Sequence, residues 1–275
     1  MVQNLSEKVA QQQPFDIYRF TARCTLDMIF ATTLGTDMHI QDSPTCTYLE
    51  VLEDLIDQLR NVMMKEGSTN HEEDIEHELN TIIFAGNETS AMTVANTILL
   101  IAMHPHVQRN LVDEMRTHFG HDVSNIRYET LTKLVYMEMV MKESLRLLPI
   151  AAVVGRKTTA EIDVGDYRLP AGVDILIDIF DIHRNPVYWG SDADQFRPER
   201  FETINYDRFS FLAFSAGPRN CVGLRYAWIS MKIMLLKVLD RYTLETDLKL
   251  EELDMKMALT MKIVNGHMMR LKRRQ

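Results

Sequence analysis

Apolar and polar residues alternate with helical spacing through most of the first half of the chain. The spacing predicts helices over residues 15–34 and 48–64, and a long helix over residues 71–103. Two further amphipathic helices are predicted over residues 107–119 and 131–147, because Gly120 and Pro149 supply helix-ending signals. Helical spacing returns over residues 225–239.

The pattern changes between the last two of these helices. Residues 151–154 and 173–182 are rich in β-branched side chains and have turn-forming residues between them, which predicts short strands. A hairpin is predicted over residues 258–271, because Asn265 and Gly266 form a pair typical of a type I′ turn. Together these patterns predict a mainly α fold with a small, separate β-sheet.

The composition narrows the class of protein. The 275 residues are 46% hydrophobic and 25% charged, as in an ordinary globular protein. The net charge of −9 gives no general support for nucleic-acid binding. The three cysteines are too few and too irregular for a disulfide framework, which fits a reducing compartment. No run of about 18 apolar residues is present, so no membrane-spanning segment is predicted.

The long predicted helix contains an unusual stretch, A-G-N-E-T-S, at residues 85–90. Gly, Asn, Thr and Ser are poor residues for the middle of a helix, so the stretch predicts an interruption with a functional purpose. A polar patch on an exposed helix is the alternative interpretation.

Cysteine chemistry is indicated by the stretch F-S-A-G-P-R-N-C-V-G, which ends at Gly223. Gly217 and Gly223 allow the backbone to approach a flat ligand and to adopt positive φ. Cys221 precedes a predicted helix, and the amide groups at a helix N-terminus stabilise a thiolate. Arg219 lies two residues earlier, where it can reach an anionic edge of the same ligand. A buried, inert thiol is the alternative for a lone cysteine.

The same stretch matches the haem-binding signature of the cytochromes P450, F-x-x-G-x-R-x-C-x-G, at every fixed position. A chance match in a chain of this length has odds of about one in 10⁴. The resemblance implies that Cys221 is the thiolate ligand of a haem iron. It also implies that the haem-binding loop and the following helix cover residues 214–241, and that the loop's contacts come from Phe214, Gly217, Arg219 and Gly223.

Residues 85–90 resemble the oxygen-binding segment of the family's long central helix, which would here span residues 71–103. In the family, an acid followed by Thr supplies protons during oxygen activation, and Glu88 and Thr89 fit that pair. Some family-4 members have a Glu where Ala85 stands and bind haem through an ester. Ala85 therefore implies non-covalent haem b.

A structural ion network is implied by two further segments. Glu143 and Arg146 match the family's Glu-x-x-Arg motif, and their i, i+3 spacing places both on one helix face. The stretch at residues 196–201 resembles the segment that supplies the third member, here Arg200. Taken alone, Glu143 and Arg146 also fit an ordinary solvated pair.

Arg156 is, by resemblance, a second partner for the haem propionates beside Arg219. An exposed strand arginine is an equally good alternative. Val153 and Val154 would then face the substrate pocket. The stretch H-R-N-P that begins at His183 also resembles a family segment, and His183 is interpreted as structural.

The resemblance covers nearly all of residues 76–272 and is strongest to the animal family-4 clan, especially its insect branch. The chain has about half of the family's length and lacks the apolar anchor and parts of the substrate pocket. We therefore expect residues 1–275 to form an N-terminally truncated, partial P450 domain.

The family implies a monooxygenase that inserts one oxygen atom of dioxygen into a lipophilic substrate. It uses NADPH-derived electrons from a flavoprotein reductase, at the cytoplasmic face of the endoplasmic reticulum membrane. Arg219, Arg225 and Lys232 are expected to meet an acidic face of the reductase. Two alternatives remain. One is a haem-thiolate enzyme that rearranges peroxides, against which Glu88 and Thr89 argue. The other is an inactive fragment that acts as a haem- or protein-binding module.

Overall fold

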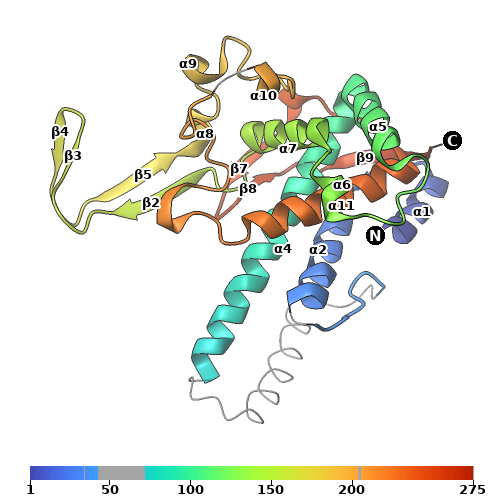
Figure 1. Ribbon diagram of the computed structural model, residues 1–275, viewed down its shortest axis with the longest axis horizontal. Coiled ribbons are helices and arrows are strands. Elements are labelled where there is room, and N and C mark those ends of the chain that lie inside the picture. The colour runs from blue at the N-terminus through green and yellow to red at the C-terminus, as the bar shows by residue number, and fades with distance from the viewer. Residues whose placement is uncertain (34, 43–71, 204–205, 275) are drawn as a thin grey trace.

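The computed structural model describes residues 1–33, 35–42, 72–203 and 206–274 (Figure 1). Its helices are α1 (Val2–Gln11), α2 (Tyr18–Thr33), α4 (Glu72–Met103), α5 (Pro105–Phe119), α6 (Tyr128–Leu131), α7 (Val135–Leu147), α8 (Ile179–Ile182), α9 (Pro186–Trp189), α10 (Arg200–Thr203) and α11 (Leu224–Arg241). Its strands are β1 (Phe15–Asp16), β2 (Val153–Lys157), β3 (Ile162–Val164), β4 (Tyr167–Leu169), β5 (Asp174–Asp178), β6 (Tyr242–Glu245), β7 (Met255–Met257), β8 (Met261–Ile263) and β9 (Met268–Arg273). The predicted mainly α fold is confirmed.

Most predicted helices are present, with corrected boundaries. The helix expected from residue 15 begins later, at Tyr18, because Phe15 and Asp16 pair with β9 as strand β1. The helix expected over residues 131–147 begins later, at Val135, as α7, and Leu131 is instead the last residue of the short helix α6. Helix α1 and the short helices α8, α9 and α10 were not predicted. The helix expected over residues 48–64 lies outside the described residues.

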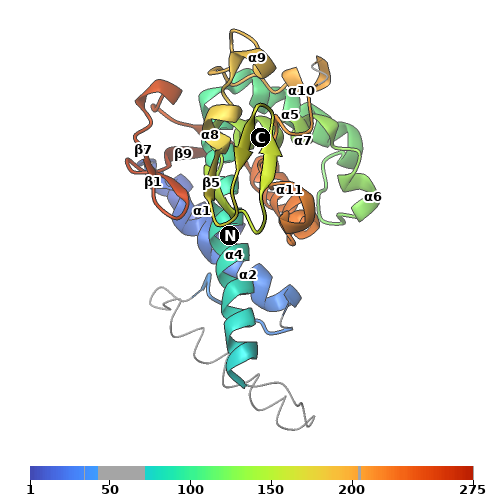
Figure 2. The same ribbon diagram turned by 90° about the vertical axis from the view of Figure 1, so that its left-hand side faces the viewer.

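Helix α4 is the central element of the fold. Its second half is buried on all sides, and Ile98, Leu99, Leu100 and Ile101 are each 0% exposed. Such a helix needs cover all round, which α2, α7, α11 and β6 provide. The first half of α4 runs beside α2 and projects with it from the body in both views (Figure 1, Figure 2). No helix in the described ranges combines the length and the apolar character that crossing a membrane requires.

The polar stretch at residues 85–90 does not interrupt α4, so that prediction is wrong. Gly86 lets α2 approach closely, because a Cβ added there would lie 2.9 Å from Ile29 Cδ1. Asn87 Oδ1 accepts a 2.6 Å hydrogen bond from Thr25 Oγ1 of α2. Contacts with α2 thus compensate for the poor helix propensity of the stretch.

The strands form small antiparallel sheets with the orders β1-β9-β6, β2-β5, β3-β4 and β7-β8. The strand predicted over residues 173–182 ends at Asp178, where α8 begins. The Asp178 carboxylate accepts the Asp181 amide at 3.0 Å and so caps α8. The paired strands β2 and β5 extend from one side of the molecule and carry β3 and β4 beyond them (Figure 1).

The predicted hairpin over residues 258–271 is wrong. Strand β8 pairs with β7, whereas β9 pairs with β6 and β1. Gly266 has a φ of 77°, but Asn265 is not among the residues with positive φ, so no type I′ turn forms. Instead, the Asn265 side chain donates to the Glu252 carbonyl at 3.0 Å and accepts the Asp254 amide at 3.2 Å. Asn265 is therefore tied to the residues before β7 and does not close a hairpin between β8 and β9.

Candidate functional site

Cys221 lies at the end of a closed loop that leads into α11. The Cys221 amide donates a 2.9 Å hydrogen bond to the Phe214 carbonyl and closes the loop. Within the loop, Ser215 has a φ of 60° and Gly217 a φ of 77°. A left-handed backbone costs Gly little, which accounts for Gly217 at this turn. A single 3₁₀ turn, Gly217–Arg219, then brings the chain back to Cys221.

The loop leaves open space around the Cys221 thiol, which is exposed. A Cβ added at Gly217 would meet nothing within 4 Å, and one at Gly223 would meet first the Cys221 Sγ, at 3.9 Å. Helix α11 begins at Leu224, so its unpaired N-terminal amides lie next to the thiol in sequence. An exposed thiol on an open, glycine-containing loop at a helix N-terminus fits a flat haem ligated through sulfur.

Cys24 provides an internal contrast to Cys221. Cys24 lies on α2, and its Sγ is 4.0 Å from the Met28 Sδ. Burial raises the pKa of Cys24 to about 11, so its thiol stays protonated at neutral pH. Of the two cysteines in the described residues, Cys221 is the exposed one. Cys46 lies outside the described residues.

Two arginines approach the Cys221 loop from different elements. Arg219 belongs to the 3₁₀ turn of the loop and is exposed. Arg156 lies on β2, opposite Ile175 of β5, and its Nη2 donates to the Ser215 Oγ at 3.3 Å. The structure therefore brings Arg156 to the same loop as Cys221, although 59 residues separate it from Ser215. Two guanidinium groups at one loop suit a ligand with carboxylates.

Ala85, Glu88 and Thr89 follow one another on α4 but have different surroundings. Ala85 and Thr89 are exposed, and the Thr89 Oγ1 donates to the Ala85 carbonyl at 2.6 Å. The Glu88 side chain is largely covered by the C-terminal strands. Its Oε1 lies 2.7 Å from the Lys262 Nζ and accepts a 3.2 Å hydrogen bond from the Thr260 Oγ1. The Glu88 carboxylate and the Thr89 hydroxyl therefore have different partners.

Lys262 and Thr260 are residues of this region that the sequence analysis missed. Thr260 lies 172 residues from Glu88 in the chain. Local periodicity carries no information about a contact between such distant positions. The hydrogen bond to Glu88 raises the pKa of Lys262, which keeps this amine charged beside the carboxylate.

Glu143, Arg146 and Arg200 form a buried ion network in which each residue is 0% exposed. The Glu143 Oε2 lies 2.7 Å from the Arg146 Nε, and the Glu143 Oε1 lies 2.9 Å from the Arg200 Nε. Of the other guanidinium hydrogens, one from Arg146 goes to the Glu143 Oε1 and one from Arg200 to the Asp192 Oδ1. The rest are donated to backbone carbonyls, those of His183, Ala193 and Gln195 for Arg146 and those of Trp189, Asp192 and Gln195 for Arg200. Buried charges are tolerated when paired and fully hydrogen-bonded in this way.

Asp192 extends the network toward the surface. Its Oδ1 lies 3.2 Å from the Arg200 Nη1, and its Oδ2 lies 3.1 Å from the Arg197 Nε. Burial acts to raise the pKa of Asp192, but the hydrogen bond and charge of Arg200, together with Arg197, lower it overall. Asp192 therefore remains ionised and balances the second guanidinium of the network.

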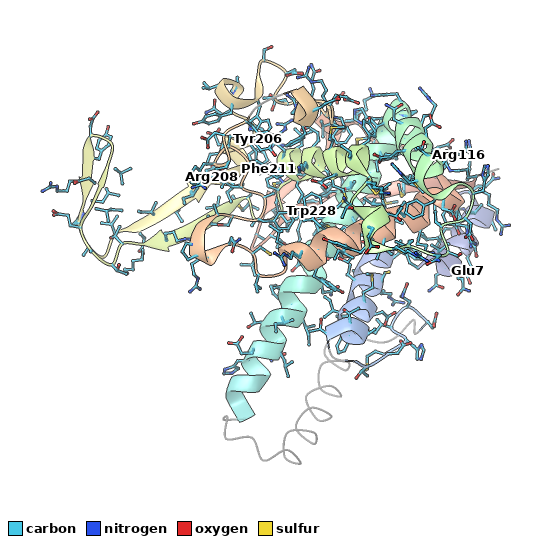
Figure 3. The ribbon with its side chains drawn as sticks, viewed as in Figure 1. Glu7, Arg116, Tyr206, Arg208, Phe211 and Trp228 are labelled. Atoms are coloured by element: carbon cyan, nitrogen blue, oxygen red, sulfur yellow. The ribbon has the colours of Figure 1, made fainter. Side chains whose placement is uncertain are left out.

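Aromatic side chains pack between this network and the start of the Cys221 loop. The Arg146 guanidinium lies 5.2 Å from the centroid of the Trp189 ring. A cluster with centroid separations of 5.4–6.4 Å contains Trp189, Phe201, Tyr206 and Phe211, the last two labelled in Figure 3. Phe214 packs on Trp228 of α11 at 5.7 Å. Aromatic contacts thus hold both the residues that precede the loop and its first position.

The predicted docking patch of Arg219, Arg225 and Lys232 is wrong in one member. Arg219 and Arg225 are exposed, but Lys232 is 5% exposed. The Lys232 Nζ donates to the Leu131 carbonyl and to the Glu138 Oε2, both at 3.1 Å. Position 232 faces α6 and α7 instead of solvent, so this lysine is a packing residue.

Comparison with known proteins finds one family over most of the chain. The family model named Cytochrome P450 matches residues 53–269. Cytochrome P450 4V2 of Mus musculus is 34% identical over 222 residues, which cover 80% of this chain and 42% of that protein. Probable cytochrome P450 313a1 of Drosophila melanogaster is 36% identical over 211 residues, which cover 73% of this chain and 42% of that protein. Cytochrome P450 3A13 of Mus musculus is 37% identical over 166 residues, covering 59% of this chain and 33% of that protein.

The chain therefore spans less than half of the length of these curated relatives. The predicted likeness to family-4 and insect proteins is confirmed by two of them. The family model covers the Cys221 loop, α4 and the buried ion network in a single match. Geometry and comparison lead to one conclusion: this chain belongs to the cytochrome P450 family.

Proposed function

We propose that this chain is the haem-binding part of a monooxygenase and that it holds haem b non-covalently through the Cys221 thiolate. The observation that carries the proposal is the exposed Cys221 thiol, held in a closed loop that Arg156 also reaches. Bound haem would supply reductive activation of dioxygen and insertion of one oxygen atom into the substrate, a chemistry that thiolate ligation favours.

The other residues of the loop would bind and orient the cofactor. Arg219 and Arg156 would pair with the haem propionates, since both guanidinium groups are exposed beside the loop. Gly217 and Gly223 leave room for the flat macrocycle to lie close to the backbone. Ala85 has no carboxyl group for an ester link, so the haem would be released intact on denaturation.

Glu88 and Thr89 would handle protons. Thr89 donates its own hydroxyl hydrogen to the Ala85 carbonyl, which leaves the lone pairs of its Oγ1 available to accept another. The Glu88 carboxylate, one residue away, is held by Lys262 and Thr260. We assign to Glu88 the transfer of protons from solvent. Thr89 would donate these protons on the exposed side of α4.

Electrons would come from NADPH through a flavoprotein reductase. Arg219 and Arg225 are exposed near Cys221 in sequence and would meet an acidic face of that partner. The substrate would be a lipophilic small molecule, and the complete protein would act at the cytoplasmic face of the endoplasmic reticulum membrane. The family has this electron donor, this class of substrate and this location, and we propose the same for this chain.

The decisive experiment is a carbon monoxide difference spectrum of the reduced, haem-supplemented chain. A strongly red-shifted Soret band in the wild type, lost in Cys221→Ser and kept in Cys24→Ser, is the expected result. Cys24→Ser is the matched control because it removes a thiol that lies away from the loop. A red-shifted band that survives Cys221→Ser would overturn the assignment.

Two competing functions are separated by the same preparation. Oxidation of a lipophilic substrate that requires NADPH and reductase supports the monooxygenase, whereas peroxide turnover without either would support a peroxide-rearranging enzyme. A chain that gives no thiolate-type band is a haem- or protein-binding fragment and not a catalyst.

A further inference from the structure

His183 joins the buried ion network to the residues that begin the Cys221 loop, through its backbone carbonyl on one side and its imidazole on the other. It lies directly after α8 and is 0% exposed. From the sequence alone it is interpreted as structural, without an assigned partner. Its importance comes from what its two ends contact.

The backbone of His183 belongs to the ion network. Its carbonyl accepts a 2.7 Å hydrogen bond from the Arg146 Nη1. Arg146 is in turn fixed by Glu143, whose two carboxylate oxygens lie 2.7 Å and 2.9 Å from its guanidinium nitrogens. The position of His183 is therefore set by a group of charges that cannot move without losing a buried partner.

The side chain of His183 belongs to the loop. Its Nε2 accepts a 2.8 Å hydrogen bond from the Leu212 amide. The Leu212 carbonyl accepts the Ser215 amide at 2.8 Å, and the Phe214 carbonyl accepts the Cys221 amide at 2.9 Å. Leu212 is thus held at both its N–H and its C=O, and the turn that it begins carries the hydrogen bond that closes the Cys221 loop.

The chemistry of the imidazole fits this contact in one protonation state only. A backbone amide can only donate, so Nε2 must be free of hydrogen and the neutral ring carries its proton on Nδ1. Burial lowers the pKa of His183 to about 4, while the nearby carbonyls of Arg146 and Leu145 act in the opposite direction. The ring also stacks on Phe211, with centroids 5.3 Å apart, which fixes its orientation.

We propose that His183 is a positioning residue for the Cys221 loop: its neutral imidazole accepts the Leu212 amide and ties the loop to the ion network of Glu143, Arg146 and Arg200. The inference deepens the proposed function, because it names what holds the sulfur ligand in place. The contact itself exists without haem and can be tested without it.

The test compares His183→Gln with His183→Met in the haem-free chain of 275 residues. The carbonyl oxygen of Gln can take the place of Nε2 as an acceptor, whereas Met fills similar space without one. Hydrogen exchange is followed by NMR at the Leu212 and Cys221 amides, with ¹⁵N-labelled leucine and cysteine. His267→Met is the matched control, since it removes another buried imidazole, one that is hydrogen-bonded to Asn96 instead of the loop.

We expect His183→Met to raise exchange at Leu212 and Cys221 by about tenfold or more, the effect of losing roughly 1.4 kcal/mol of local protection. His183→Gln should stay close to the wild type, and His267→Met should leave both amides protected. Equal exchange in the Gln and Met variants would overturn the proposal, because packing alone would then explain the residue. So would unchanged exchange in His183→Met.

If His183→Met does not fold, the hydrogen bond can be removed from the other side. Replacing Leu212 by its α-hydroxy acid removes the amide hydrogen and leaves the side chain unchanged. Faster exchange at Cys221 supports the proposal, and unchanged exchange overturns it. These outcomes do not depend on haem, so a chain without a thiolate-type spectrum would disprove the proposed function and leave this inference standing.

Discussion

The ion network of Glu143, Arg146 and Arg200 and the residues expected to meet haem lie in opposite surroundings. Every member of the network is 0% exposed and finds its partners within the chain. Cys221, Arg219, Arg156, Ala85 and Thr89 are all exposed. The network is satisfied within the chain, whereas the exposed residues remain accessible to a ligand.

In this chain the residues that hold the fold together are largely separate from those expected to meet haem. Buried, paired charges matter most for stability, because removing one partner leaves the other charge buried and uncompensated. Groups that are exposed contribute little to stability and are free to bind. Substitutions in the first group should therefore lower the free energy of unfolding, and substitutions in the second should alter haem binding with little change in stability.

Glu143→Gln should cost the most stability. It removes the one carboxylate that Arg146 and Arg200 share and leaves Arg200 with Asp192 as its remaining acid; breaking such a buried pair typically costs about 3–5 kcal/mol. Urea denaturation followed by circular dichroism measures the free energy of unfolding. Asp247→Asn, which breaks the exposed pair with Arg270, is the control and should change the free energy far less. Similar losses in the two variants would remove the distinction between buried and exposed charges.

Acid should destabilise the fold through His183. Burial lowers its pKa from 6.5 to about 4, so between these pH values the unfolded chain binds a proton that the folded chain does not. The stabilisation is fully present above pH 6.5, falls as the pH decreases toward 4 and then levels off. The slope is up to about 1.4 kcal/mol per pH unit. His183→Gln should flatten the curve by this amount, and identical curves for wild type and variant would contradict the pKa shift.

Gly217→Ala should have an intermediate effect confined to the Cys221 loop. A Cβ there meets no atom within 4 Å, so the cost comes only from the φ of 77°. A left-handed backbone costs a residue with a side chain about 1–2 kcal/mol. Faster amide exchange across residues 214–221 with little change in global unfolding is the expected result. Gly223→Ala, where φ is −83°, is the control and should leave exchange unchanged.

Lys262→Met should lower the free energy of unfolding only slightly, and this loss should decrease as the salt concentration rises. The Lys262 side chain is 49% exposed and its pair with Glu88 is partly screened, which limits such a bridge to about 0.2–1 kcal/mol. A double-mutant cycle with Glu88→Gln at low and high salt measures the coupling. A coupling that does not weaken with salt would show that the pair is more buried than its exposure indicates.

Cys221→Ser should change the stability of the haem-free chain least, by no more than about 0.5 kcal/mol, because the thiol is exposed. The same substitution is expected to abolish the thiolate-type spectrum. A variant that lost both its stability and its thiolate-type spectrum would show that Cys221 also stabilises the fold. Stability and haem binding would then not be separate at this residue.

Part of the fold was readable from local patterns. The helical spacing located α4, α5, α7 and α11 closely, because their buried faces repeat along the chain. It missed α1, and it did not foresee that Phe15 and Asp16 join β9, since pairing with a distant strand leaves no local trace. The prediction that α4 is interrupted was wrong for the same reason. Contacts with Ile29 and Thr25 of α2 stabilise the helix at residues 85–90 in spite of their poor helix propensity.

The family could be recognised from local spacing alone, that of Phe214, Gly217, Arg219, Cys221 and Gly223, and motifs identified the members of the ion network. Which groups come into contact depended on the three-dimensional packing. It brought Arg156 to Ser215, Lys262 to Glu88 and the Leu212 amide to His183, and it buried Lys232 against α6 and α7. The physical reason is that a motif records the local requirements of a backbone and its ligand. Contacts between residues far apart in the chain depend on how whole elements pack.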